Sequence, residues 1–295
     1  MDQWSLCLYD HVRNPIPKPS SKTPQLPIMK MSSTPLAAFA VLVLAGPACA
    51  ATLLLADHFN ESTANEVTSS FNNNLSATQT GTLATTTYNI GSGGGNEAQH
   101  SNGAKQLTVA NITSYGNVSV NNNFATQANA ANLPLQISFN IVNVFGYAGD
   151  TTRWVQFNVG NSQNLAVNNG AAMVGVLFRV NGGTQTFNSG TNVGGEPSWS
   201  QNDLVTITLS GTGGIGSAFS SNGTEASVQI GSNNIGTFTL AQQSNAYLTF
   251  SAFNFGNDQF GGGEFDNLSV SLIPEPSAAL LGGLGLLALL RRRRV

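Results

Sequence analysis

An all-β fold, an antiparallel β-sandwich, is predicted for residues 51–273 of this 295-residue chain. Apolar and polar residues alternate with a period of two in many short segments, as they do in strands with one buried face. Clusters of Gly, Asn and Ser separate these segments, as tight turns require. No segment has the 3.6-residue period of a convincing amphipathic helix. Short alternating strands divided by turns are typical of two packed sheets.

The expected strands cover most of this region. The clearest is 135–145, in which Leu135, Ile137, Phe139 and Ile141 share one face. Alternating segments of the same kind are found at 52–59, 83–90, 105–110, 116–120, 153–159, 173–180, 204–210, 226–231, 246–255 and 264–272. Asn181-Gly182 between two strands predicts a hairpin. The Gly-rich stretches 89–103 and 256–263 are expected to be loops, and neither fits a phosphate loop, because neither leads into a helix and 89–103 has no Gly-Lys-Ser/Thr ending.

Charge is sparse and negative in the predicted sandwich. Residues 51–273 contain three basic and eleven acidic side chains, a net charge of −8. Nucleic-acid binding is excluded on this basis, since phosphates require a basic surface. The two cysteines, Cys7 and Cys49, both precede residue 51. A chain processed at that point has no disulfide and no cysteine metal site.

Residues 29–50 have the pattern of a cleavable signal peptide. Lys30 precedes an apolar run, Leu36–Ala45, which is too short to span a bilayer. Ala48 and Ala50 fit the small-x-small rule for signal peptidase, so cleavage is expected after Ala50. A buried core segment, or a lipid on Cys49, are the alternatives. Residues 1–28 contain five prolines and are interpreted as a disordered extension or the product of a wrongly assigned start codon.

Residues 274–295 follow the last expected strand and are predicted to lie outside the fold. Pro274-Glu275-Pro276 interrupts regular structure. Ala278–Leu290 is an apolar or glycine run, about 20 Å long as a helix against a hydrocarbon core of about 30 Å. Four arginines, Arg291, Arg292, Arg293 and Arg294, end the chain and favour a cytoplasmic position for that end of a membrane helix. A terminal helix packed on the sandwich is disfavoured because the run has no polar face.

These features resemble the PEP-CTERM sorting signal of Gram-negative bacteria. Pro274, Glu275 and Pro276 match its motif, Ala278–Leu290 its membrane segment and the arginines its basic tail. The resemblance implies processing by an exosortase and an association with exopolysaccharide and biofilm. It also implies export across the inner membrane, a transient C-terminal anchor, and a final place at the cell surface or in the extracellular matrix.

The last strand, with Phe265, Asp266, Asn267 and Val270, resembles that of the concanavalin-like jelly rolls common among such proteins. In these folds the first and last strands lie side by side. The resemblance therefore places 52–59 next to 264–272. A structural Ca²⁺ near those strands is a further implication, with Asp57, Glu61, Asp266 and Asn267 as candidate ligands. Ordinary turn and capping hydrogen bonds are the alternative.

Catalytic machinery is not evident. Jelly-roll hydrolases that resemble laminarinases carry three carboxylates at alternate positions of one strand, whereas Glu264 and Asp266 are followed here by Leu268. His58 and His100 have no Gly-x-Ser-x-Gly partner motif. Trp199, in a loop, and Trp154, in a strand, are candidate glycan contacts, although both indoles are equally suited to packing.

The function predicted first is a non-catalytic, exported surface or matrix protein with the segments 1–28, 29–50, 51–273 and 274–295. The expected partners are signal peptidase, an exosortase and, through the C-terminal helix, the membrane. A carbohydrate-binding module with a polysaccharide ligand is the alternative, and a divergent glycoside hydrolase is the second alternative. No cofactor other than the calcium ion is expected.

Overall fold

A computed structural model of the protein describes residues 51–59, 65–67, 79–90, 96–100, 107–111, 115–146, 154–163, 169–195, 197–211, 224–240, 245–253 and 261–273. Contacts between Cα atoms divide the chain into units 1–43 and 44–295, and every described residue belongs to the second unit. The predicted signal peptide with Ala48 and Ala50, the motif Pro274-Glu275-Pro276, the helix before the arginines and Arg291–Arg294 all lie outside the described residues.

The described strands form two sheets whose pairs are antiparallel, so the predicted two-sheet, all-β architecture is confirmed. The larger sheet has ten strands in the described residues: β1 (Thr52–Asp57), β2 (Asn65–Val67), β3 (Gln79–Thr80), β5 (Asn96–His100), β6 (Leu107–Asn111), β8 (Leu135–Phe145), β13 (Asp203–Gly211), β14 (Thr224–Ile230), β15 (Asn233–Leu240) and β17 (Gly261–Leu272). The smaller has seven: β4 (Tyr88–Ile90), β7 (Tyr115–Val120), β9 (Trp154–Gly160), β10 (Ala172–Arg179), β11 (Thr184–Asn188), β12 (Thr191–Gly195) and β16 (Tyr247–Phe253).

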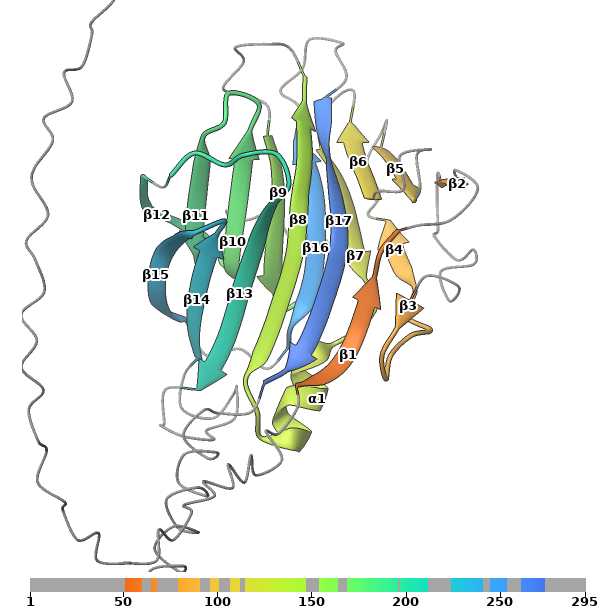
Figure 1. Ribbon diagram of the computed structural model, residues 1–295, viewed down its shortest axis with the longest axis vertical. Coiled ribbons are helices and arrows are strands. Elements are labelled where there is room, and N and C mark those ends of the chain that lie inside the picture. The colour runs from red at the N-terminus through yellow and green to blue at the C-terminus, as the bar shows by residue number, and fades with distance from the viewer. Residues whose placement is uncertain are drawn as a thin grey trace, which may run out of the picture. The chain divides into compact units, whose positions relative to one another are not determined.

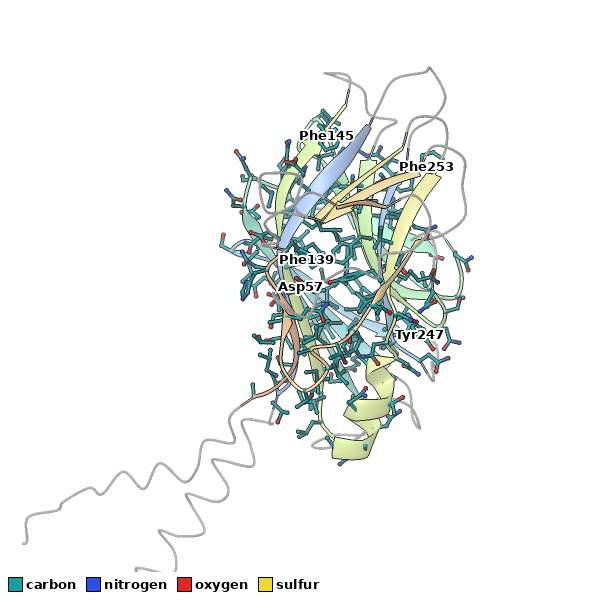
Figure 2. The ribbon with its side chains drawn as sticks, turned by 90° about the vertical axis from the view of Figure 1, so that its right-hand side faces the viewer. Asp57, Phe139, Phe145, Tyr247 and Phe253 are labelled. Atoms are coloured by element: carbon teal, nitrogen blue, oxygen red, sulfur yellow. The ribbon has the colours of Figure 1, made fainter. Side chains whose placement is uncertain are left out.

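The two sheets lie face to face, with β8 and β17 in front of β9 and β16 in Figure 1. The core between them follows from the period-two pattern. Phe139 projects from the ten-stranded sheet, and its ring centre lies 4.5 Å from that of Phe157 and 5.6 Å from that of Phe250 on the other sheet. Figure 2, which turns the molecule by 90°, shows Phe139 between the sheets. Close aromatic pairs of this kind add to the free energy gained by burying the rings.

The first and last strands are neighbours, as expected from the resemblance to jelly rolls. Thr52 pairs with Leu272 and Asp57 with Leu268. The last strand, β17, also pairs with β8 and β6, so it lies inside the sheet and not at its edge. Its apolar residues Phe265, Leu268 and Val270 are fully buried. The ten-stranded sheet is therefore completed by the last twelve residues of the fold.

The structure corrects three expectations. The stretch 89–103 is not one loop, because β4 extends to Ile90 and β5 occupies Asn96–His100. The stretch 256–263 already contains the first three residues of β17. A Cβ atom on Gly263 would lie 2.8 Å from Val155 of the opposite sheet, so the glycine permits close packing of the sheets.

A short helix, α1 (Phe124–Ala131), is the third correction, because no helix was expected within the sandwich. Asn123 caps it through a side-chain oxygen that accepts from Ala125 N, and Asn132 ends it in the left-handed region. No helix in the described part of the chain is long and apolar enough to span a membrane.

Candidate ligand-binding site

Asp57 lies at the end of β1 and is fully buried. Its Oδ1 accepts from the backbone N–H of Phe59 at 2.9 Å. Its Oδ2 accepts from Tyr88 Oη at 2.9 Å and from Gln79 Nε2 at 3.0 Å. A buried carboxylate is tolerated where hydrogen bonds replace its hydration, and here neutral donors from β3, from β4 and from Phe59 after β1 do so. Asp57 therefore ties three strands together.

Asp266 lies at a bulge of β17, near enough to Asp57 to be affected by its charge. Asp266 pairs with Asn140 but Ser269 pairs with Ser138, so β17 has one extra residue at this point. Asn267 adopts φ +52°, and its N–H donates to Asp266 Oδ1 at 2.7 Å. Burial raises the pKa of Asp266, the Asn267 N–H and His58 oppose this, and the charge of Asp57 raises it further. The two carboxylates predicted to meet are thus close enough to interact.

These residues fit a hydrogen-bonded carboxylate better than a calcium site. Ca²⁺ takes six to eight oxygen ligands, but both oxygens of Asp57 already accept from three donors. His58 Nδ1 lies 2.8 Å from Asn267 Oδ1, which therefore has a partner too. The described residues contain no group of three or more His, Cys, Asp or Glu side chains that could hold a metal ion. The candidate ligand Glu61 lies outside the described residues.

Calcium is accordingly expected to leave the melting temperature of the protein unchanged, whether the ion is added in excess or removed with a chelator. A bound ion would act by mass action and add about 2.7 kcal/mol to the free energy of unfolding at a hundredfold excess over its Kd. Differential scanning calorimetry in both buffers measures this. A rise of several degrees that saturates with Ca²⁺ and is lost in Asp57→Ala would instead establish the site predicted at Asp57.

Asp266→Asn is expected to raise the melting temperature at pH 7. Because the folded state raises the pKa of Asp266 above its ordinary value of 3.8, ionisation of this side chain opposes folding. The free energy of unfolding is therefore reduced at pH values above the raised pKa. This reduction disappears as the pH falls through the raised pKa towards 3.8. The gain from Asp266→Asn should therefore shrink as the pH is lowered, which melting curves at several pH values measure. A gain that is equal at pH 7 and pH 3 contradicts this account.

The carboxylates of β17 do not form the hydrolase pattern. Glu264 and Asp266 are partly exposed on the outer side of β17. Leu268, in the third position, is fully buried in the core, because the bulge at Asn267 changes the alternation. A carboxylate at position 268 would therefore face the core. His58 contacts Asn267, and His100 lies on β5 at the position that pairs with Leu107.

The outer face of the seven-stranded sheet, directed away from the core, carries amide and hydroxyl side chains. Val155, Phe157 and Val159 of β9 are in the core, so Gln156 and Asn158 lie on the outer face. Strand pairing places Asn117, Ser251 and Gln156 in one row across β7, β16 and β9, which we name the Asn117 row. Ser119, Thr249 and Asn158 form the next row. All six side chains are buried.

An aromatic pair continues this face beyond the Asn117 row. Trp154 of β9 pairs with Phe253 of β16, and their rings stack with centres 4.6 Å apart and planes 7° apart. Both rings are half-buried. Figure 2 shows Phe253 at one end of β16 and Tyr247 at the other. Trp154 also pairs with Arg179 of β10, the neighbour of β9 opposite β16. The Arg179 guanidinium donates to Gln185 Oε1 at 2.6 Å. Apolar ring surface and uncharged hydrogen-bonding groups thus adjoin on one face.

Trp199 lies outside the strands, as its sequence position indicated, but its indole packs against the core. Its indole N–H donates to the carbonyl oxygen of Arg179 at 2.8 Å. Its ring meets Phe178 edge to face, with centres 6.4 Å apart, and packs against the core. The backbone N–H of Trp199 also donates to Gly182 O at 2.9 Å in the β10–β11 hairpin, where Gly182 takes φ +86°. Trp199 therefore caps the core, and its role as a glycan contact stays a prediction.

Comparison with known proteins yields no match to a family model and none to a curated protein. Among solved structures, the carbohydrate recognition domain of Emp47p is similar at 13% identity, with 75% of this chain and 97% of that chain covered and a TM-score of 0.43. Lectin II from Ulex europaeus matches at 9% identity, covering 72% and 98%, with a TM-score of 0.38. A mutant of Trypanosoma rangeli sialidase displaying trans-sialidase activity matches at 10% identity, covering 77% and 32%, with a TM-score of 0.44. TM-scores this low decide neither fold nor ligand.

Proposed function

We propose that residues 51–273 form a non-catalytic carbohydrate-binding domain whose ligand lies against Trp154 and Phe253. The parallel stack of these two rings on the outer face of the seven-stranded sheet carries the proposal. A sugar ring has an apolar face, which packs on an aromatic ring, and a rim of hydroxyl groups, which need hydrogen-bonding partners. An apolar surface with a few placed polar groups is the usual make-up of a small-ligand site.

The surroundings of the stack support a sugar over a charged ligand. The Asn117 row directly beside it consists of amide and hydroxyl groups. Arg179, the charged residue that pairs with Trp154, already donates to Gln185. The negative charge of residues 51–273 as a whole disfavours anionic partners. Packing of the aromatic pair as a second small core is the competing account, and it predicts no ligand at all.

Trp154→Ala is expected to reduce polysaccharide binding at least tenfold, because the variant removes the larger ring of the stack. Affinity electrophoresis and calorimetric titration against soluble β-glucan, mannan, galactan and alginate measure the effect. Trp199→Ala is the comparison variant, since it removes an indole that packs edge to face on Phe178. It should lower the melting temperature, and loss of binding in this variant alone, with its fold intact, would move the ligand from Trp154 to Trp199. If wild-type protein binds no member of the panel, the proposed function is wrong.

We also propose that this domain is exported, anchored briefly by residues 274–295, and released by an exosortase to the cell surface or the matrix. The order of the Pro-Glu-Pro motif, apolar run and arginines supports this, together with the signal-like pattern of 29–50. The exopolysaccharide to which such sorting is linked is then the natural ligand class. A concanavalin-like jelly roll is the finer fold that we propose, on the basis of the paired terminal strands.

A further inference from the structure

The turn that leads into β10 carries an Asn-Gly pair at the surface. Four such pairs occur in the chain, and two of them, Asn169-Gly170 and Asn181-Gly182, lie within the described residues. Asn169 and Gly170 are both exposed. Because glycine has no side chain, its backbone nitrogen is unhindered and can attack the side-chain amide of the asparagine before it. The pair 169–170 is therefore a candidate for a reaction of the chain with itself.

The side chain of Asn169 is folded forward over the next peptide group. Its Oδ1 accepts from Ala171 N–H at 2.9 Å, which closes an Asx turn around Gly170. The carbonyl oxygen of Asn169 accepts from Ala172 N–H at 2.9 Å, so a β-turn holds the same residues. An N–H group that donates to Oδ1 stabilises the negative charge that develops on this oxygen when a nucleophile adds to Cγ. The turn thus prepares the Asn169 amide for attack.

The pair Asn181-Gly182 has the same Asx turn but a different nitrogen. Asn181 is also exposed, and its Oδ1 accepts from Gly183 N–H at 3.0 Å. The Gly182 N–H, however, donates to Arg179 O at 3.0 Å within the β10–β11 hairpin. No hydrogen bond between described residues uses the Gly170 N–H. The two sites therefore differ in whether a hydrogen bond holds the attacking nitrogen.

We propose that Asn169 is a site of spontaneous deamidation, at which the chain converts this residue into aspartate and isoaspartate. The Gly170 nitrogen loses its proton to hydroxide and forms a bond with Cγ of Asn169. The Cγ–Nδ2 bond then breaks, and Nδ2 leaves as ammonia with a proton from water, which regenerates the hydroxide. The product is a five-membered succinimide. Water opens this ring at Cγ to give aspartate, or at the backbone carbonyl carbon to give isoaspartate, so water is the only co-reactant.

Both products change the turn before β10. In isoaspartate the main chain passes through Cβ and Cγ, so the backbone gains one carbon atom at residue 169. This displaces the carbonyl group that accepts from the N–H of Ala172, the buried first residue of β10. Either product also adds one negative charge, which takes residues 51–273 from −8 to −9. Aged protein is therefore expected to be more acidic than fresh protein and to melt at a lower temperature.

Gly170→Ala tests the proposal without disturbing the fold. A Cβ atom on Gly170 would meet no atom within 4 Å, and the φ of this residue lies outside the left-handed region. The melting temperature of fresh protein should therefore be unchanged or higher. The added methyl group hinders the nitrogen, so conversion at 169 should slow by about tenfold or more, which corresponds to a modest rise of the barrier. The fall in melting temperature on ageing should be correspondingly smaller.

Peptide mapping compares the two sites in one sample. Purified protein is aged in mildly alkaline buffer and digested with trypsin, which cleaves after Arg153 and Arg179 and so places Asn169 and Asn181 in different peptides. Tandem mass spectrometry follows conversion at each site, and electron-transfer fragmentation separates isoaspartate from aspartate. Conversion at 169 should be about tenfold faster than at 181, because a backbone hydrogen bond of ordinary strength must first be lost at 181.

Three results would overturn the proposal. Conversion at 169 that is no faster than at 181 would mean that the free N–H does not select the site. An unchanged rate in Gly170→Ala would exclude the Gly170 nitrogen as the nucleophile. Aspartate without isoaspartate at 169 would mean direct hydrolysis by water, with no ring. None of these results depends on glycan binding, which Trp154→Ala tests separately.

Discussion

Asp57→Ala is expected to lower the free energy of unfolding by about 3 kcal/mol, since each buried donor left without its acceptor costs about 1–3 kcal/mol. The substitution takes the acceptor from Phe59 N–H and Tyr88 Oη, while Gln79 Nε2 retains Thr86 O at 3.0 Å. Urea unfolding of the purified protein measures the change. A loss below about 0.5 kcal/mol, the range of an ordinary surface position, would show that this carboxylate does not hold the strands together.

Tyr88→Phe is the comparison that separates the hydrogen bond from the packing around it. Tyr88 is 3% exposed, and its ring lies 6.1 Å from that of Phe59, a contact that phenylalanine keeps. The variant removes one donor from Asp57 and should cost about 1 kcal/mol. The double variant should cost less than the sum of the two single changes, because both remove the same hydrogen bond. Additive costs would mean that the two residues act independently.

Strand periodicity predicted most of the two sheets because strands such as β8 and β13 have one face that is buried along most of its length. In β8, Leu135, Ile137, Phe139 and Ile141 are all fully buried, as the alternation required. The last strand shows the limit of this reasoning. Its bulge at Asn267 places Leu268 in the core three residues after Phe265, and the sequence of β17 does not mark the bulge. The helix α1 was missed because eight residues rich in alanine give no clear periodicity, although Asn123 is a recognisable cap.

The candidate site was less accessible to sequence reasoning than the fold. Alternation in β9 separates Trp154 from Val155, but both faces of this strand are largely buried, so the pattern alone did not say which face is the core. Phe253 lies about a hundred residues from Trp154, and only the register of β9 and β16 brings the rings together.

The first residues of β1 and the last residues of β17 lie at one end of the sandwich, and the aromatic pair lies at the other end. Phe145 pairs with Gly262 at the start of β17, whereas Leu135 pairs with Leu272 at its end, beside Thr52 of β1. Figure 2 shows Phe253 at the same end as Phe145. A domain anchored through residues 274–295 would therefore hold the stack of Trp154 and Phe253 at the end remote from its anchor. This arrangement suits a polysaccharide outside the membrane.

Deleting residues 274–295 is expected to leave the melting temperature unchanged, whereas deleting 261–295 should abolish folding. The second deletion removes β17, whose Phe265, Leu268, Val270 and Leu272 are buried. Each such side chain contributes about 1.5–3 kcal/mol, so the four together approach the whole net stability of a domain, about 5–15 kcal/mol. Pro274 and Pro276 separate the last strand from the apolar run, since neither has a backbone N–H to extend a sheet. Circular dichroism melts of the two truncated proteins measure the contrast.

The same tail is expected to control processing, because four arginines resist burial in a fold and stay hydrated on the cytoplasmic side of a membrane. Replacing Pro274, Glu275 and Pro276 with alanine should leave an uncut precursor in the inner membrane of a host that has an exosortase. Replacing Arg291–Arg294 with serine should instead weaken retention before cleavage. Mass spectrometry of the mature C-terminus in strains with and without that peptidase compares the two cases. A tail that still ends at Val295 in both strains would refute the sorting proposal. In the truncation experiment, a melting temperature that falls when 274–295 is removed would show that the tail belongs to the fold.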